Sequence, residues 1–183
     1  RGYGFCFFDV FQARADNVLR AARDALADGL PEGMFFTDPG EVDDALVRQC
    51  QECMVRNGVV PFYGALLAGR HGAAALVAVR NAEGRIVATG FSHMPHNEAS
   101  PHHRAAWGGL VAVDKAERGR RLGVAVNAML AERAVSLLGA ERLYQLVPTT
   151  STISRRMIAR SGLIFDPETK CAIATEAERR PAH

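Results

Sequence analysis

The stretch that most constrains the fold is residues 110–130, LVAVDKAERGRRLGVAVNAML. An apolar run typical of a strand ends at Val113, a short polar and basic loop follows, and an amphipathic helix is predicted to begin near Leu122. This order brings the free backbone N–H groups of a helix N-terminus and several arginines to one point. Such a point favours the binding of a phosphate-bearing ligand.

The composition is that of a soluble globular protein with a single domain. The 183 residues are 48% hydrophobic and 23% charged, which is too apolar for a disordered chain and long enough to bury a core. The net charge of +2 gives no support for a nucleic-acid partner. No apolar run approaches the ~20 residues that cross a bilayer, and the first ten residues lack the features of a signal peptide. We therefore expect a cytoplasmic protein that contacts neither nucleic acid nor membrane. Because the chain begins with Arg1, we also expect a fragment or a processed product.

The four cysteines, at positions 6, 50, 53 and 171, are too few and too irregularly spaced for a disulfide framework. Cys50 and Cys53 form a C-x-x-C pattern, but they lie in the middle of a helical pattern rather than at its start. A redox motif places its reactive thiol at a helix N-terminus, where the thiol pKa is lowered. We therefore predict reduced thiols that face the core.

The alternation of apolar and polar residues predicts a mixed sheet packed by helices in one domain, residues 1–183. Strands are predicted at 3–10, 73–80, 85–92, 105–113, 142–147, 163–165 and about 170–176, and helices at about 13–30, 38–57, 122–138 and 149–160. Asp38 is expected to cap the second helix, with Pro39 in its first turn and Glu41 closing a capping box. The charged tail, about 177–183, is expected to be disordered.

The basic loop carries a resemblance to a known family. Residues Arg118-Gly-Arg-Arg-Leu-Gly123 match the pattern of Arg or Gln, two residues, Gly, one residue, Gly or Ala, with Arg121 in place of the middle glycine. The loop lies between a strand and a helix, and a second strand–helix unit ends at Ser161-Gly162-Leu163. On these residues the chain resembles the GNAT superfamily of acetyl-CoA-dependent N-acetyltransferases, over about residues 73–165. The resemblance implies an α/β (α+β) fold, with a mixed, mostly antiparallel sheet and helices on both faces.

The resemblance also implies acetyl-CoA as the acyl donor. Val111 and Val113 are expected to pair with the pantetheine arm. The pyrophosphate is expected at the N–H groups of the loop, which comprises Arg118, Gly119, Arg120, Arg121, Leu122, Gly123 and Val124. Ser151 and Ser154, at the start of the last helix, are further candidates for cofactor contact, with capping of the helix the simpler expectation for Ser151.

The residues that usually carry the proton transfers in this family are absent from the matching positions. Counted back from Gly162, the position of the usual phenol acid falls on Ile158, and the strand position of the usual base falls on Trp107 or Gly109. None of these side chains exchanges a proton, and Tyr144 in the following strand is only a weak substitute for the acid.

Two alternatives remain for the base. The amine could lose its proton through water, with the enzyme supplying positioning and polarisation of the thioester carbonyl. Otherwise the polar loop 93–104 supplies the base, and its candidates are His96, Glu98, His102 and His103. His103 and Glu98 are the predicted catalytic residues because they are titratable and close to the strand that lines the cofactor. His93, His96, His102 and His103 together resemble a metal ligand set, but no tetrahedral spacing accompanies them, so no metal is predicted.

Two functions from different classes fit these observations. The first is an N-acetyltransferase that moves an acetyl group to a primary amine of a small molecule or peptide by direct attack, without an acyl-enzyme. The second is a catalytically inactive module of the same fold that binds CoA or another phosphate ligand as a sensor or partner-binding unit. A homodimer is expected by analogy with the family.

Overall fold

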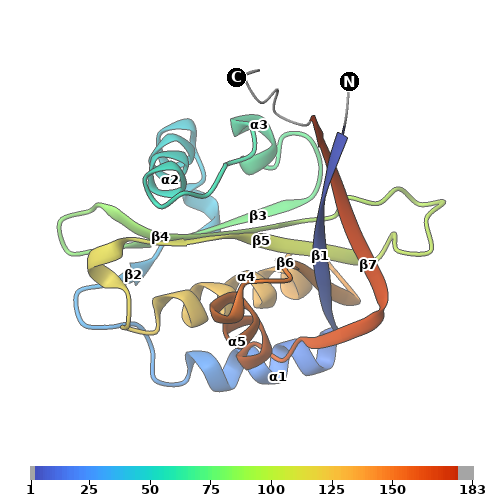
Figure 1. Cartoon of the computed structure of the whole chain (residues 1–183). Coiled ribbons are helices and arrows are strands. Elements are labelled where there is room, and N and C mark those ends of the chain that lie inside the picture. Colours follow the sequence, from blue (N-terminus) through green and yellow to red (C-terminus); the bar gives the residue numbers. More distant parts are fainter. Residues whose placement is uncertain (1–2, 177–183) are drawn as a thin grey trace, which may run out of the picture.

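A computed structural model describes residues 3–176 of the chain, and the tail predicted to be disordered lies outside this range. The described residues form one seven-stranded sheet in the order β2-β3-β4-β5-β6-β1-β7 (Figure 1). The strands are β1 (Tyr3–Arg14), β2 (Phe35–Phe36), β3 (Ala74–Arg80), β4 (Ile86–His93), β5 (Ala105–Val113), β6 (Arg142–Pro148) and β7 (Ile164–Glu176). Only β5 and β6 pair in parallel. The predicted mixed and mostly antiparallel sheet is confirmed.

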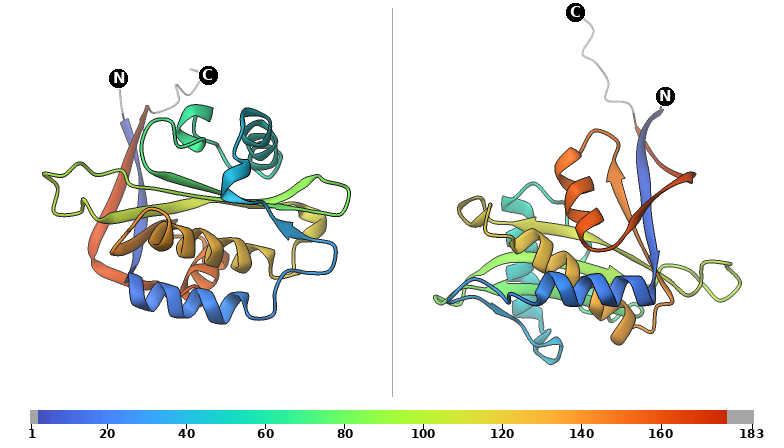
Figure 2. Two further views of the ribbon diagram at one scale, coloured as in Figure 1. Left: turned by 180° about the vertical axis from the view of Figure 1, so that it is seen from behind. Right: turned by 90° about the horizontal axis from the view of Figure 1, so that it is seen from below.

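Helices cover both faces of the sheet, as predicted (Figures 1 and 2). One face carries α2 (Asp44–Arg56) and the short α3 (Gly64–Leu67). The opposite face carries α1 (Ala15–Leu26), α4 (Leu122–Ser136) and α5 (Thr152–Arg160), and two short 3-10 helices, η1 (Pro39–Glu41) and η2 (Lys115–Glu117), lie in connecting loops. Within the described range, no helix is long and apolar enough to span a membrane.

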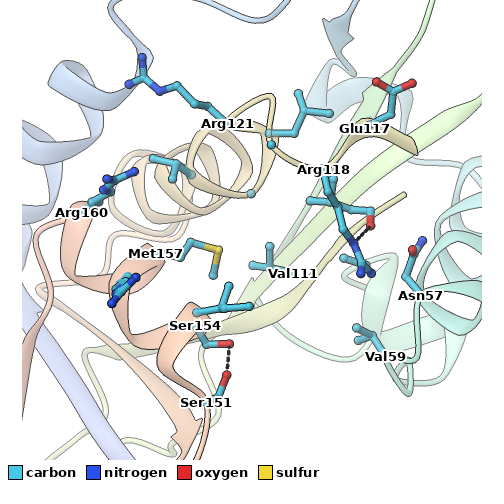
Figure 3. A pocket seen from close by; sticks show the side chains of 18 residues that line it. Asn57, Val59, Val111, Glu117, Arg118, Arg121, Ser151, Ser154, Met157 and Arg160 are labelled. Carbon is cyan, nitrogen blue, oxygen red and sulfur yellow. Dashed lines mark hydrogen bonds between the residues drawn. The ribbon is translucent and has the colours of Figure 1, made fainter. Parts of the chain in front are cut away.

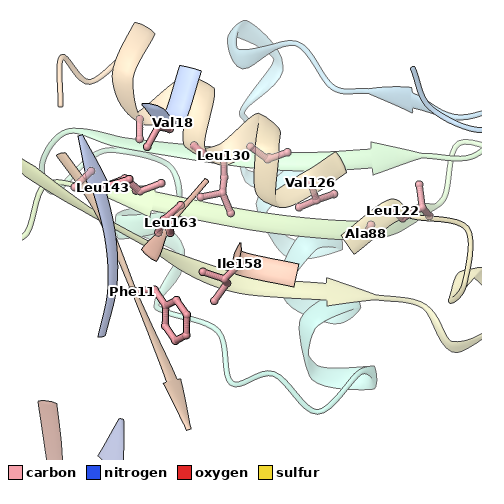
Figure 4. Close-up of a cluster of buried hydrophobic side chains, with 14 of the residues drawn as sticks. Phe11, Val18, Ala88, Leu122, Val126, Leu130, Leu143, Ile158 and Leu163 are labelled. Atoms are coloured by element: carbon pink, nitrogen blue, oxygen red, sulfur yellow. The ribbon is translucent and has the colours of Figure 1, made fainter. Parts of the chain in front are cut away.

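Two glycines let α4 pack unusually close to the central strands. A Cβ added at Gly90 in β4 would lie 2.7 Å from Val126 Cγ1, and one at Gly108 in β5 would lie 2.8 Å from Leu130 Cδ1. Val126 and Leu130 are therefore pressed into the sheet and are fully buried. They belong to the main core between the sheet and the helices α1, α4 and α5 (Figure 4), which also includes Phe11, Val18, Ala88, Leu122, Leu143, Ile158 and Leu163. This packing fixes the N-terminus of α4 relative to the end of β5.

The structure corrects two predicted boundaries. Asp38 does not begin the second helix: its Oδ1 accepts a hydrogen bond from Gly40 N (2.8 Å) and starts η1. Asp43 caps α2 instead, since its Oδ1 accepts from Leu46 N (2.7 Å). Both Asp38 and Asp43 suit an N-cap, and the sequence alone does not distinguish them. The packing of α2 on the sheet selects Asp43. The two predicted closing strands are joined in the 13-residue β7, which pairs with β1 on both sides of an irregularity at residues 167–169.

The prediction for the C-x-x-C pattern is confirmed. Cys50 and Cys53 lie in α2, are fully buried, and are free thiols. Burial raises the pKa of Cys50 to about 12, with a further contribution from Cys53, and burial raises the pKa of Cys53 to about 11. Neither thiol is therefore a nucleophile at neutral pH.

Candidate cofactor cleft and catalytic site

The site forms where the two parallel strands of the sheet separate. Residues Ala105–Gly108 of β5 pair with Arg142–Gln145 of β6. Beyond these residues β5 continues to Val113 and β6 continues to Pro148 without further pairing between them. The second halves of the two strands therefore bound a V-shaped opening in the sheet.

A β-bulge in β5 lies at the start of this opening. Phe91 in β4 is opposite Gly109, whereas Thr89 is opposite Ala112, so two residues of β5 stand against one of β4. One of them, Leu110, has the left-handed φ of +52°, which is rare for a residue with a branched side chain. A bulge removes a residue from the ladder and bends its strand. It thus turns β5 away from β6 and exposes main-chain groups of β5 along the opening.

The basic loop closes one end of the opening with the N-terminus of α4. Arg121 is the N-cap residue, and its side chain makes no capping hydrogen bond. The first bond of the helix runs from Ala125 N to Arg121 O (3.0 Å). The N–H groups of Leu122, Gly123 and Val124 precede that bond and have no acceptor within the helix, so they are available to an anion.

Arg121 adopts the conformation that the family pattern assigns to glycine. Its φ is +64° and its ψ is +6°, in the left-handed region, and Gly119 has a φ of +85°. The turn therefore forms although arginine replaces the glycine, and Arg121 adopts a backbone conformation that is unfavourable for a residue with a Cβ. The guanidinium of Arg121 pairs with Asp28 (Nη1–Oδ2, 2.6 Å), and that of Arg120 pairs with Glu117 (Nη1–Oε2, 2.6 Å). These two arginines are already partnered by carboxylates.

A cleft of about 770 Å³ occupies the opening (Figure 3). All the residues predicted to contact the cofactor line it except Arg120: Val111, Val113, Arg118, Gly119, Arg121, Leu122, Gly123, Val124, Ser151 and Ser154. Arg156, Met157 and Arg160 of α5 form part of the wall, and Asn57 and Val59 contribute from beyond α2. Arg118, whose Nε donates to Val113 O (3.3 Å), lies across the cleft from Arg160 (Figure 3). The cleft therefore combines an apolar floor with a basic mouth.

Ser151 and Ser154 are on the wall that α5 contributes. Ser151 is the N-cap residue of α5, but its side chain makes no cap, so the predicted capping is wrong. Its hydroxyl donates instead to Ser154 Oγ (2.8 Å). Both hydroxyls remain at the surface of the cleft, where they are free to bind a polar group.

A buried polar network that the sequence analysis did not identify holds the walls together. Gln145 Nε2 in β6 donates to Asn127 Oδ1 in α4 (2.8 Å), and Asn127 Nδ2 donates to Ser161 Oγ after α5 (2.8 Å). Ser161 in turn donates to Met157 O (3.3 Å). These side chains are at most 2% exposed, so each group depends on its partner in the network. The network fixes α5 to β6 at the point where β6 leaves β5.

A second cluster anchors the end of β5. The carboxylate of Asp114 accepts from Arg56 (Nε–Oδ1, 2.7 Å), Asn57 (Nδ2–Oδ1, 2.7 Å) and Arg85 (Nη2–Oδ2, 3.0 Å). Burial would raise the pKa of Asp114, but the hydrogen bonds from Arg56 and Asn57 and the charges of the two arginines outweigh it and lower that pKa. Asp114 is thus a fixed anion that joins α2 and the β3–β4 hairpin to the start of the basic loop.

His103 and Glu98, the predicted catalytic residues, are exposed in the loop between β4 and β5. Neither lines the cleft, and His103 Nδ1 lies 3.0 Å from Ser100 O. The loop projects from the end of β5 opposite the basic loop (Figure 1), and the nine residues of β5 span roughly 27 Å. The structure does not bring these two side chains to the cleft, and their catalytic role stays a prediction.

A different pair of titratable side chains lies beside the split. His96 Nε2 is 3.1 Å from the hydroxyl of Tyr144. In β6, Tyr144 immediately precedes Gln145, the last residue of that strand that pairs with β5. Burial and the nearby His102 lower the pKa of His96, and burial and the nearby Cys171 raise the pKa of Tyr144. Both shifts favour the neutral forms of the two side chains at pH 7.

The positions of the usual acid and base hold apolar groups. Ile158 is buried in the main core. Trp107 packs against Phe62 and His93, with ring centroids 5.5 Å and 5.6 Å away. Its indole also covers Gly109, where an added Cβ would lie 2.5 Å from Trp107 Cη2. Among residues 3–176, no group of three or more His, Cys, Asp or Glu side chains is placed to hold a metal ion.

No protein-family model matches the sequence, and a comparison with curated protein sequences gives no match. The structure, in contrast, resembles solved structures. A GCN5-related N-acetyltransferase from Kribbella flavida matches with a TM-score of 0.62 at 14% identity, over 94% of this chain and 59% of that one. The chain has the GNAT fold. A GCN5-related N-acetyltransferase from Sphaerobacter thermophilus matches with a TM-score of 0.60 at 19% identity, over 90% of this chain and 50% of that one.

A tandem GNAT protein from the clavulanic acid biosynthesis pathway matches with a TM-score of 0.62 at 16% identity, over 93% of this chain and 54% of that one. The chain spans about half to three fifths of the length of these three structures. At such low identity, the likeness is one of fold. The predicted resemblance to the GNAT superfamily is thereby confirmed for the architecture.

Proposed function

We propose that the chain is an acetyl-CoA-dependent N-acetyltransferase that acts on a primary amine of a small molecule or peptide. The observation that carries the proposal is the cleft at the split of β5 and β6, closed at one end by the uncapped N-terminus of α4. Unpaired strand edges suit an amide-bearing chain such as pantetheine, and free helix N–H groups suit a pyrophosphate. Acetyl-CoA presents both groups in one molecule.

Each wall of the cleft would bind a different part of acetyl-CoA. The N–H groups of Leu122, Gly123 and Val124 would hold the pyrophosphate, with positive charge from Arg118 and the α5 arginines. The bulged edge at Val111 would hold the pantetheine arm and direct the thioester toward the split. None of the residues that line the cleft is a cysteine, which favours direct attack by the amine over an acyl-enzyme. Positioning of the two reactants would supply much of the rate enhancement.

Titration calorimetry with acetyl-CoA tests the cofactor, with dephospho-CoA and ATP as controls. We expect saturable binding of acetyl-CoA, and no heat of binding would overturn the proposal. Release of free CoA thiol is then measured against a panel of primary amines. Amine-dependent release supports the transferase, whereas saturable binding without release for every amine would support an inactive CoA-binding module.

A further inference from the structure

The hydrogen-bonded pair of His96 and Tyr144 lies next to the point where the pairing of β5 and β6 ends. Tyr144 precedes Gln145, the last residue of β6 that pairs with β5. Successive side chains in a strand point to opposite faces, and Gln145 points toward α4. The phenol therefore points to the other face, which carries α2 and α3. Its register partner in β5, Trp107, packs on the same face against Phe62.

We propose that Tyr144 and His96 are the acid and the base of the acetyl transfer. The assignment rests on the proposed function, because it names the residues that move protons in that reaction. The cleft begins on β5 at Val111, three residues beyond Gly108, where the pairing with β6 ends, and Tyr144 is one residue before the end of that pairing on β6. A thioester that reaches from the cleft to the end of the pairing, and an amine on the α2 face, would therefore react beside the phenol. The assignment also supplies the acid and the base that Ile158, Trp107 and Gly109 do not provide.

The proton transfers balance within the pair. The amine nitrogen forms a bond to the acetyl carbon, the carbon–sulfur bond breaks, and the sulfur leaves with the electron pair. Tyr144 gives its hydroxyl proton to that sulfur, and His96 Nε2 takes the proton that the amine loses. The proton on His96 then passes across the 3.1 Å hydrogen bond to the Tyr144 oxygen. The products are the amide and the free CoA thiol, and the pair returns to its starting state.

The surroundings of the pair favour these roles. His96 lies beside His102, with ring centroids 5.6 Å apart, and it interacts electrostatically with His93. Cys171 in β7 is the titratable group that acts on Tyr144. Burial and these neighbours keep His96 unprotonated and Tyr144 protonated near neutral pH, which is the state a base and an acid need before the reaction.

The chain contains a matched control. Tyr63 and His71 form a second hydrogen-bonded pair, with the hydroxyl 3.2 Å from Nδ1. Both side chains are exposed, and they flank α3 rather than the split. Both pairs therefore consist of a tyrosine hydroxyl and an imidazole, and they differ in their distance from the split between β5 and β6.

The test compares Tyr144→Phe and His96→Ala with Tyr63→Phe and His71→Ala in the purified protein. We expect kcat to fall at least about 100-fold in the first two variants, with acetyl-CoA affinity within twofold of the wild type. The control variants should keep the wild-type kcat. The acid limb of the kcat–pH profile should disappear in His96→Ala, and added imidazole should restore part of its turnover. A merely structural role of His96 would leave that limb in place and give no imidazole rescue.

Unchanged kcat in Tyr144→Phe and His96→Ala, in a wild-type protein that turns over, would overturn the pair while leaving the proposed function intact. A wild-type protein without turnover for any amine would overturn both. Loss of turnover in Glu98→Gln or His103→Ala, with full turnover in His96→Ala, would make Glu98 or His103 the base and also refute the assignment. If His96→Ala does not fold, the imidazole rescue is replaced by the kcat–pH profile of Tyr144→Phe, whose alkaline limb should be lost.

Discussion

The left-handed conformation of Arg121 allows a quantitative test of the structure of the basic loop. Arg121→Gly and Arg121→Ala both remove the exposed ion pair with Asp28, so its contribution cancels when the two variants are compared. They differ in the cost of the φ of +64°. This conformation costs a residue with a Cβ about 1–2 kcal/mol, whereas glycine loses roughly 0.4–1 kcal/mol more than alanine in chain entropy on folding. We therefore expect the glycine variant to be more stable by about 1 kcal/mol.

Urea unfolding at equilibrium measures this difference as the free energy of unfolding of each variant. Arg20, which is exposed in α1, gives the control with the opposite sign. In a helix interior alanine is favoured over glycine by about 1 kcal/mol, so Arg20→Ala should be more stable than Arg20→Gly. If Arg121→Ala is as stable as Arg121→Gly while the Arg20 pair behaves as expected, the loop does not adopt the left-handed turn in solution.

Three further substitutions test the site and its supports. Gly123→Asp should weaken acetyl-CoA binding at least about tenfold, because it places a carboxylate beside the N–H groups proposed for the pyrophosphate. Ala116→Asp adds the same charge outside the cleft and should leave the affinity unchanged. Calorimetry that finds the same affinity for Gly123→Asp as for the wild type would refute the anion site. Asp114→Asn should lower the free energy of unfolding by about 2 kcal/mol at pH 7. Because the folded pKa of Asp114 is lowered, its contribution is fully present above the unfolded pKa of 3.8 and is lost as the pH falls through the folded pKa. The difference in unfolding free energy between wild type and variant in urea titrations should therefore be constant near pH 6 and decrease only as the pH falls below about 4. Asn127→Ala should cost about 2–4 kcal/mol in thermal unfolding, because it leaves two buried partners unsatisfied and opens a cavity; a loss below 1 kcal/mol would show that water replaces the amide.

The local pattern of the sequence determined the elements that bound one end of the cleft. The apolar run before the loop, the glycines in it and the helical pattern after it predict the strand, the turn and the start of α4, and the structure has all three. The predicted amphipathic character of α4 is wrong, because the helix is buried on most of its surface and Leu137 lies exposed beyond its end. These features depend on residues close in the chain, whose backbone preferences and periodicity can be read directly. The same holds for the buried thiols of Cys50 and Cys53, which follow from their place in a helical pattern.

Tertiary structure decided which polar groups meet. His96 and Tyr144 are 48 positions apart, and Gln145 and Ser161 reach Asn127 from different elements. Placement of β1 between β6 and β7 likewise joins the two ends of the described chain. The histidines of the β4–β5 loop cannot be ranked from the sequence, because all of them lie in the same polar segment. The pairing of β5 with β6 brings the loop and Tyr144 together, and His96 is the histidine that contacts the phenol. Such pairings depend on packing between segments that are distant in the chain, and local propensity and residue spacing do not predict that packing.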